Sequence, residues 1–226
     1  MVVTKQEPNE TAREYALREI RQNIISLKLE PGSLVSENDL AKELGVSRTP
    51  IREAILDLKK WDLVQVFPQK GSIISLIDLD LVEETVFLRL TLEKAVVEAL
   101  CDTITEEELE ELNHNIQLQE FYLHNLSPNK ILELDNEFHH ALFRMCNKER
   151  IFNLMAGMQG HFDRIRALSL FSVKEIKIVS DHKIILNAIR EKNKELAKEL
   201  MEKHLSRYKL DQNEILEKYP NYFVKR

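Results

Sequence analysis

Apolar residues repeat every three or four positions along most of this chain, which is the spacing of helices with one buried face. In the first third of the chain, this spacing predicts three helices, over residues 11–27, 36–45 and 47–60. Pro31-Gly32 separates the first helix from the second, and Gly45 ends the second helix. Two helices joined by a short, glycine-containing turn are typical of a helix-turn-helix.

The pattern changes twice after this motif. Two short β-prone runs, residues 63–67 and 72–76, flank Pro68-Gln69-Lys70-Gly71, which predicts a hairpin. From residue 78 the pattern is purely helical and predicts six helices, near residues 78–102, 105–125, 128–146, 149–171, 173–191 and 193–217. We therefore expect a mainly α protein with two domains. Residues 1–77 form a winged helix-turn-helix with a small β-hairpin wing, and residues 78–226 form an all-α six-helix bundle.

The composition narrows the class of protein. Charged residues make up 31% and hydrophobic residues 43% of the chain, which is typical of a soluble globular protein. There is no run of about 18 apolar residues and no apolar core of a signal peptide near the start, so we expect a cytoplasmic protein that does not bind membranes. Cys101 and Cys146 stand alone within helical segments, which indicates reduced core thiols rather than a zinc ribbon or a disulfide.

The first turn of the third predicted helix has the chemistry of a DNA-reading element. In a helix-turn-helix, the start of the second helix enters the major groove. Arg48 and Arg52 lie one turn apart, opposite the apolar stripe, and arginine can bond to both O6 and N7 of guanine. Gly71 at the wing tip allows a close approach of the backbone to the minor groove. The candidate DNA-binding residues are Ser47, Arg48, Thr49, Arg52, Lys70 and Gly71.

A plain solvated, basic helix start is the alternative interpretation of this turn. The whole order of three helices and a hairpin argues against it. This region resembles the winged helix-turn-helix of the GntR family of bacterial regulators, over GSLVSENDLAKELGVSRTPIREAILDLKKWDLVQVFPQKGSIIS. The most specific part of the match is LGVSRTPIREAILDL, which is followed at the usual distance by the wing glycine. The resemblance implies that Ser47, Arg48, Thr49, Arg52 and Gly71 contact DNA.

One position departs from the family pattern. Many relatives have an arginine in the second helix where this chain has Asn38. We expect one phosphate or base contact to be weaker or replaced there.

Four polar side chains interrupt the apolar stripes of three helices in the second predicted domain. Each would cost about 1 to 3 kcal/mol in an apolar interior without a partner, and one metal ion would satisfy all four. Three imidazoles and a carboxylate suit zinc, with nickel or manganese as alternatives. The four candidate ligands are Asp135, His139, His182 and His204. The alternative is that each histidine is separately hydrogen-bonded in the core. His140, on the polar face of its helix, is excluded from the set.

The second domain resembles the FCD domain of the FadR subfamily, in its shorter VanR-type branch. Metal-binding members use an Asp-x-x-x-His pair and two later histidines, and the four candidates match those positions. The resemblance implies a small carboxylate effector that is bound through the metal. Arg89 matches an arginine that is frequent in this domain, and His161 and Arg164 are further candidates for the pocket. Both arginines have surface or ion-pair roles as their alternative.

These features predict a DNA-binding transcription regulator and not an enzyme. We expect a homodimeric repressor whose affinity for double-stranded operator DNA is controlled by a small carboxylic acid, bound at or near the metal. Two rival interpretations remain. In one, the metal is purely structural and the effector binds elsewhere. In the other, the metal activates water in a hydrolase, although the chain has no HExxH motif and no obvious general base beside the ligands.

Overall fold

The computed structural model describes residues 1–67, 71–125, 127–172 and 177–225. The chain divides into two compact units. The first contains Met1–Asp80 together with Leu216–Arg226, and the second contains Leu81–Ile215. None of the described helices has both the length and the apolar character needed to cross a membrane.

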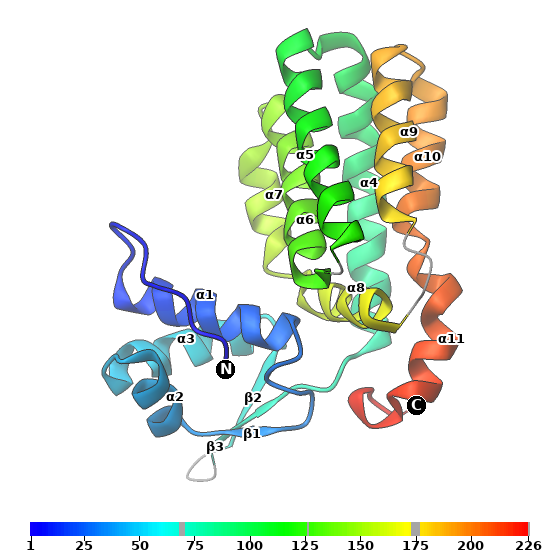
Figure 1. Cartoon of the computed structure of the whole chain (residues 1–226). Coiled ribbons are helices and arrows are strands. Elements are labelled where there is room, and N and C mark those ends of the chain that lie inside the picture. Colours follow the sequence, from blue (N-terminus) through cyan, green and yellow to red (C-terminus); the bar gives the residue numbers. More distant parts are fainter. Residues whose placement is uncertain (68–70, 126, 173–176, 226) are drawn as a thin grey trace. The chain divides into compact units, whose positions relative to one another are not determined.

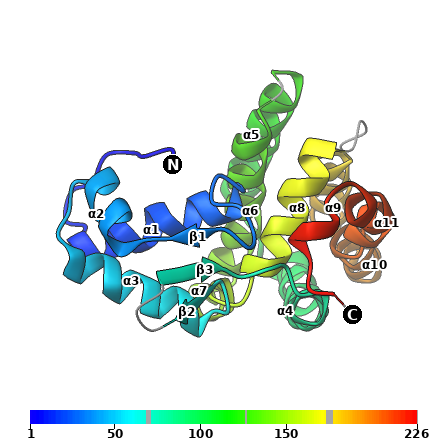
Figure 2. The same cartoon turned by 90° about the horizontal axis from the view of Figure 1, so that it is seen from below.

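The first unit is the predicted winged helix-turn-helix. Its elements are α1 (Ala12–Ile25), β1 (Leu34–Val35), α2 (Glu37–Leu44), α3 (Arg48–Lys60), β2 (Val64–Phe67), β3 (Gly71–Ile74) and the short 3-10 helix η1 (Pro220–Tyr222). The hairpin of β2 and β3 is confirmed, and β1 joins it to give an antiparallel sheet in the order β1-β3-β2. Figures 1 and 2 show the three helices beside this sheet. The sequence pattern missed β1, because two residues are too few for an alternation to be recognised.

Local signals explain the helix boundaries of this unit. Thr11 forms a capping box with Glu14 at the start of α1, and Ser36 caps α2 by accepting a hydrogen bond from the Asn38 amide. Gly45 ends α2 in the left-handed region, with φ of 67°, which makes the tight turn to α3 possible. Ser47 stands at the N-cap of α3, but its hydroxyl accepts no capping hydrogen bond from the backbone of this helix.

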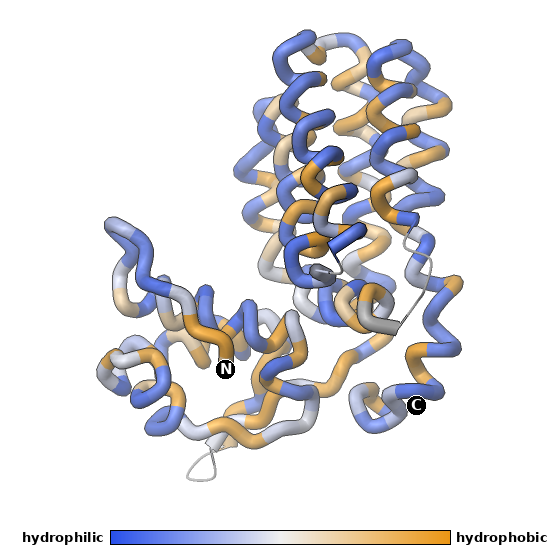
Figure 3. Tube along the Cα trace, viewed as in Figure 1, coloured by the Kyte–Doolittle hydropathy of each residue, from blue (hydrophilic) through white to orange (hydrophobic). Residues whose placement is uncertain are grey.

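The second unit is helical, as predicted. Its elements are α4 (Leu79–Thr103), α5 (Glu106–His124), α6 (Pro128–Met145), α7 (Glu149–Ala156), α8 (Gly160–Ser172), α9 (Ile178–Arg190), α10 (Lys194–Leu205) and α11 (Tyr208–Lys218). The long helices α4, α5, α6, α9 and α10 run side by side (Figure 1). Hydrophobic and hydrophilic residues alternate along them (Figure 3), and the apolar ones build a core that includes Leu100, Leu112, Phe138, Ile185 and Met201.

Two of the six predicted helices are each divided into two. The predicted helix over residues 149–171 breaks between α7 and α8, where the Met158 carbonyl accepts a hydrogen bond from the Thr85 hydroxyl at 2.9 Å. The predicted helix over residues 193–217 breaks between α10 and α11, where Arg207 donates two hydrogen bonds of 2.6 Å to Asp181. In both places a tertiary contact engages a residue at the break, although the apolar spacing continues through it.

Candidate functional site

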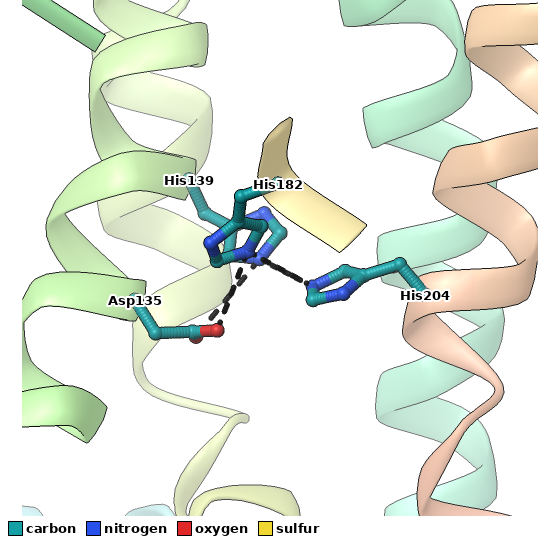
Figure 4. Close-up of side chains that lie close together, drawn as sticks. All are labelled: Asp135, His139, His182 and His204. Carbon is teal, nitrogen blue, oxygen red and sulfur yellow. Dashed lines mark hydrogen bonds and ion pairs between the residues drawn. The ribbon is translucent and has the colours of Figure 1, made fainter. Parts of the chain in front are cut away.

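Three helices of the second unit bring four polar side chains together. Asp135 and His139 lie one turn apart on α6, His182 lies on α9, and His204 lies on α10. All four are buried, with at most 8% of their surface exposed. One donor atom from each lies within 4.8 Å of the others (Figure 4). The structure thus brings together the four residues that the sequence proposed as metal ligands.

The Nε2 atoms of the three imidazoles point toward a common centre. The Nε2 of His204 is 3.1 Å from that of His139 and 3.3 Å from that of His182. The carboxylate of Asp135 borders the same space, because its Oδ1 is 3.5 Å from His182 Nε2 and its Oδ2 is 3.9 Å from His139 Nε2. Two arrangements can give such short nitrogen–nitrogen distances: hydrogen bonds between the rings, or a shared cation between them.

The opposite side of each ring faces an acceptor oxygen. His139 Nδ1 is 2.5 Å from the Glu93 carboxylate, and His182 Nδ1 is 2.9 Å from the side-chain oxygen of Gln119. His204 Nδ1 is 3.5 Å from the Asp181 carboxylate. These partners favour the tautomer with hydrogen on Nδ1, which leaves a lone pair on every Nε2. Three lone pairs that face each other repel, and a cation among them removes the repulsion.

The charge states of these groups suit metal ligation. Burial lowers the pKa of His139 and of His182, and it lowers the pKa of His204 to about 4. The rings are therefore neutral near pH 7. Burial opposes ionisation of Glu93, but Arg89 and His139 outweigh it and lower its pKa to about 2. An ionised carboxylate that holds the Nδ1–H of a ligating histidine is the usual outer partner of such a ligand. The residues present therefore fit zinc or a similar ion.

A cavity of about 60 Å³ opens beside this cluster. Asp135 and His204 lie in its wall, together with the guanidinium groups of Arg89 and Arg166. Arg89 is paired with Glu93 at 2.6 Å, and Arg166 forms an ion pair with Asp135. The rest of the lining includes Phe162, Ser169, Leu170, Lys177, Arg207, Tyr208 and Asp211. The cavity is thus small, partly apolar and bordered by cations.

Two of the three effector candidates from the sequence do not line this cavity. His161 and Arg164 are both buried, and a guanidinium nitrogen of Arg164 lies 3.1 Å from His161 Nδ1. Only Arg89 lies in the wall. The excluded His140 is half-exposed and lies 3.1 Å from the Glu149 carboxylate, away from the cluster.

Three further buried residues that contact the cluster were not predicted from the sequence: Gln119, Glu93 and Arg166. Gln119 is fully buried, and its amide nitrogen donates to Asn115, which turns its oxygen toward His182. The spacing of Arg89 and Glu93 at four residues was a signal for their ion pair, but helical periodicity does not show which polar residues meet between helices.

The start of α3 forms an exposed surface beside the wing. Ser47, Arg48, Thr49 and Arg52 are all exposed, and the Arg48 side chain retains 67% of its free surface. Arg48 lies 3.4 Å from Glu37 at the start of α2. A groove beside them is lined by Ser36, Glu37, Asn38, Arg48, Arg52, Ile55, Leu56, Val66, Phe67, Gly71 and Ser72. Lys70 lies outside the described residues.

A winged helix-turn-helix whose third helix begins with two exposed arginines, followed in the chain by a helical unit, is typical of DNA-binding transcriptional regulators. The comparisons with known proteins agree. Residues 13–74 match the gntR family of bacterial regulatory proteins, and residues 84–207 match the FCD domain. The chain therefore belongs to the GntR family and has an FCD C-terminal domain.

Individual relatives are similar over most of their length. A helix-turn-helix-type transcriptional regulator in an unstable DNA locus of Streptomyces ambofaciens is 35% identical over 86% of this chain and 82% of its own. The helix-turn-helix-type transcriptional repressor RspR of Escherichia coli is 25% identical over 98% of both chains. The solved structure of McbR/YncC of E. coli has the same fold, with a TM-score of 0.79, 17% identity and coverage of 92% of this chain and 99% of its own. The families and relatives are regulators and not enzymes.

Proposed function

We propose that this regulator senses a small carboxylate through a divalent metal ion held by Asp135, His139, His182 and His204. The observation that carries the proposal is the convergence of three imidazole Nε2 atoms whose Nδ1 sides face acceptor oxygens. Zinc suits this donor set best, and nickel or manganese can replace it. When bound, the ion would supply a positive charge that attracts an anionic oxygen.

The cavity supports a carboxylate as the effector. Arg89 and Arg166 border it, so an anion that enters would find two guanidinium groups near the candidate ligands. Its volume of about 60 Å³ suits a molecule of a few heavy atoms. The adjoining cavity also favours a sensory metal over a purely structural one, because a structural site needs no space for a ligand.

The first unit binds operator DNA through the start of α3 and the wing. Arg48 and Arg52 read base edges in the major groove, Ser47 and Thr49 bind phosphates, and Gly71 with Lys70 brings the wing to the minor groove. Residues 1–77 thus form the operator-binding domain, and residues 78–226 form the effector-sensing domain. Relatives include named repressors, RspR and the gluconate operon repressors of two Bacillus species, which supports a repressor.

A homodimer follows from the need to place two reading helices on a palindromic operator. The second unit offers exposed apolar side chains for it, because Phe87 and Met158 line one surface hollow and Leu154 is exposed on α7, with Phe87 and Leu154 each 73% exposed. Sedimentation should give a dimer for the wild type and a monomer for Phe87→Asp. Phe121→Asp, at an exposed position on α5, is the matched control and should stay dimeric.

Elemental analysis tests the metal, and thermal melts in a panel of small carboxylic acids test the effector. We expect about one metal ion per chain in the wild type, and its loss in the His139→Ala/His182→Ala double variant. Carboxylates should raise the melting temperature of the metal-loaded wild type only. A His140→Ala variant, whose ring lies outside the cluster, should behave as the wild type does. Equal melting shifts in the double variant would refute the metal-bound sensor.

A further inference from the structure

Helix α11 belongs to both compact units. The chain passes from one unit to the other within α4, after Asp80, and returns within α11, after Ile215. Because α11 is one regular helix from Tyr208 to Lys218, the return passes through ordered helix and not through a loose linker. α11 precedes the C-terminus in Figure 1.

The first turn of α11 forms part of the cavity wall. Tyr208 and Asp211 both line the cavity, and His204 stands one turn before Tyr208 at the end of α10. The Tyr208 ring packs edge-on against Phe162, with 5.6 Å between ring centroids. Ser169 of α8 donates a hydrogen bond to the Asp211 carboxylate. A molecule that enters the cavity therefore contacts the start of α11.

The segment after α11 is bound to the DNA-binding unit. Two backbone hydrogen bonds join this segment to Ile77. The Ile77 amide donates to the Tyr222 carbonyl at 2.7 Å, and the Val224 amide donates to the Ile77 carbonyl at 3.0 Å. Ile77 is fully buried and Phe223 is 5% exposed. Burial and the nearby carboxylate of Glu30, in the loop before β1, raise the pKa of Tyr222. Ile77 lies between β3 of the wing and the start of α4.

We infer that α11 couples the cavity to the winged helix-turn-helix: a change at Tyr208 and Asp211 is passed along the helix to the Phe223–Ile77 pairing and so to β3. The inference rests on the proposed function, in which the cavity holds the effector. A single flexible linker would transmit no such change. Here the two chain passages are instead tied to each other by Ile77 and Phe223, next to the strand at the centre of the wing sheet.

The first test needs no ligand and measures hydrogen exchange of the Ile77 amide in the full chain. Ser169→Ala removes the bond that holds Asp211 to α8, and Tyr208→Ala removes the ring from the cavity wall. In both variants we expect the Ile77 amide to exchange about fivefold faster, as for a loss of about 1 kcal/mol in local stability. Thr103→Ala, whose hydroxyl bonds to the Ala99 carbonyl on α4 and lies outside the cavity wall, is the matched control. Wild-type exchange at Ile77 in both variants would overturn the inference.

The second test separates the inference from the proposed function and uses zinc alone as the probe. Phe223→Ala should bind zinc with an affinity within about twofold of the wild type, but should lose the wild type's zinc-dependent change in affinity for a selected operator duplex. Val224→Ala, at a 45% exposed position, should keep that change. If Phe223→Ala also keeps the zinc-dependent change in DNA affinity, α11 does not couple the cavity to the winged helix-turn-helix. The proposed metal-bound sensor is not contradicted by that result. If zinc does not bind the wild type, the proposed metal is wrong, and the exchange experiment still decides the inference.

Discussion

The Nε2 atoms of His139 and His204 lie 3.1 Å apart in the interior of the helical unit, although the two residues are 65 positions apart in sequence. Each ring meets a carboxylate on its other side, Glu93 for His139 and Asp181 for His204. Asp181 is in turn held by Arg207. The pair is thus oriented from outside, so the rings cannot easily turn their nitrogens away from each other.

Glu93→Gln should weaken metal binding. The substitution keeps the size of the side chain but removes the charge that holds His139 Nδ1–H, so we expect the metal affinity to fall about tenfold or more. It also leaves Arg89 without its charged partner, so the free energy of unfolding should fall by about 3 kcal/mol. Competition with a chromogenic chelator measures the affinity. Glu98→Gln, at a half-exposed position on the same helix, should change neither quantity.

Removal of the metal should leave the helical unit folded but less stable. Its core of apolar residues on α4, α5, α6, α9 and α10 does not depend on the cluster. Dialysis against a chelator should therefore keep the far-ultraviolet dichroism of helices and lower the melting temperature by about 10 °C. Loss of the helical signal at room temperature would instead show that the metal is purely structural.

Gly71→Ala should destabilise the wing. Gly71 has φ of 99°, and an added Cβ would lie 3.2 Å from the Val35 carbonyl oxygen on β1. We expect a loss of about 2 kcal/mol in the free energy of unfolding of the first unit. Urea unfolding followed by the fluorescence of Trp61, the single tryptophan of the chain, measures it.

Gly45→Ala is the control for this prediction. Gly45 also has a positive φ, of 67°, but nothing lies within 4 Å of an added Cβ. It should cost only about 1 kcal/mol, the strain of the left-handed conformation itself. Equal losses in the two variants would mean that the approach of β1 to Gly71 contributes nothing.

Arg48→Ala should relax operator preference. If Arg48 reads a base, the variant loses about 1 to 3 kcal/mol on the operator and little on random duplex, and the salt dependence of its binding stays nearly constant. Lys59→Ala, an exposed cation at the far end of α3, should leave the preference intact. A uniform loss on all sequences, with a salt slope lower by about one, would assign Arg48 to phosphate binding.

Periodicity was a good guide to the helices and a poor guide to their ends. The predicted helices over residues 11–27, 36–45 and 47–60 match α1, α2 and α3 within two residues, because caps and a glycine stop are local signals. The break before α8 has a local signal that the apolar spacing did not weigh, because Gly157 caps the end of α7 and Gly160 begins α8. At the break before α11, Arg207 binds Asp181 of α9, a contact that the spacing along one helix does not show.

The candidate metal site shows the same division. Spacing along each helix was enough to turn Asp135, His139, His182 and His204 inward, because the face of a residue follows from its position in a 3.6-residue repeat. Spacing did not distinguish Arg166, which lies in the cavity wall, from Arg164, which stands two positions before Arg166 in α8 and contacts His161. The difference depends on which neighbouring helix each side chain meets.

The sequence by itself determined the two kinds of fold, the place of the helix-turn-helix and the inward direction of the four candidate ligands, since all of these follow from local propensity and periodicity. The tertiary structure alone decided that three Nε2 atoms meet while their Nδ1 atoms face acceptor oxygens, that a cavity opens beside them, and that the chain after α11 pairs with Ile77. These relationships join residues far apart in the chain, and only packing brings such residues into contact.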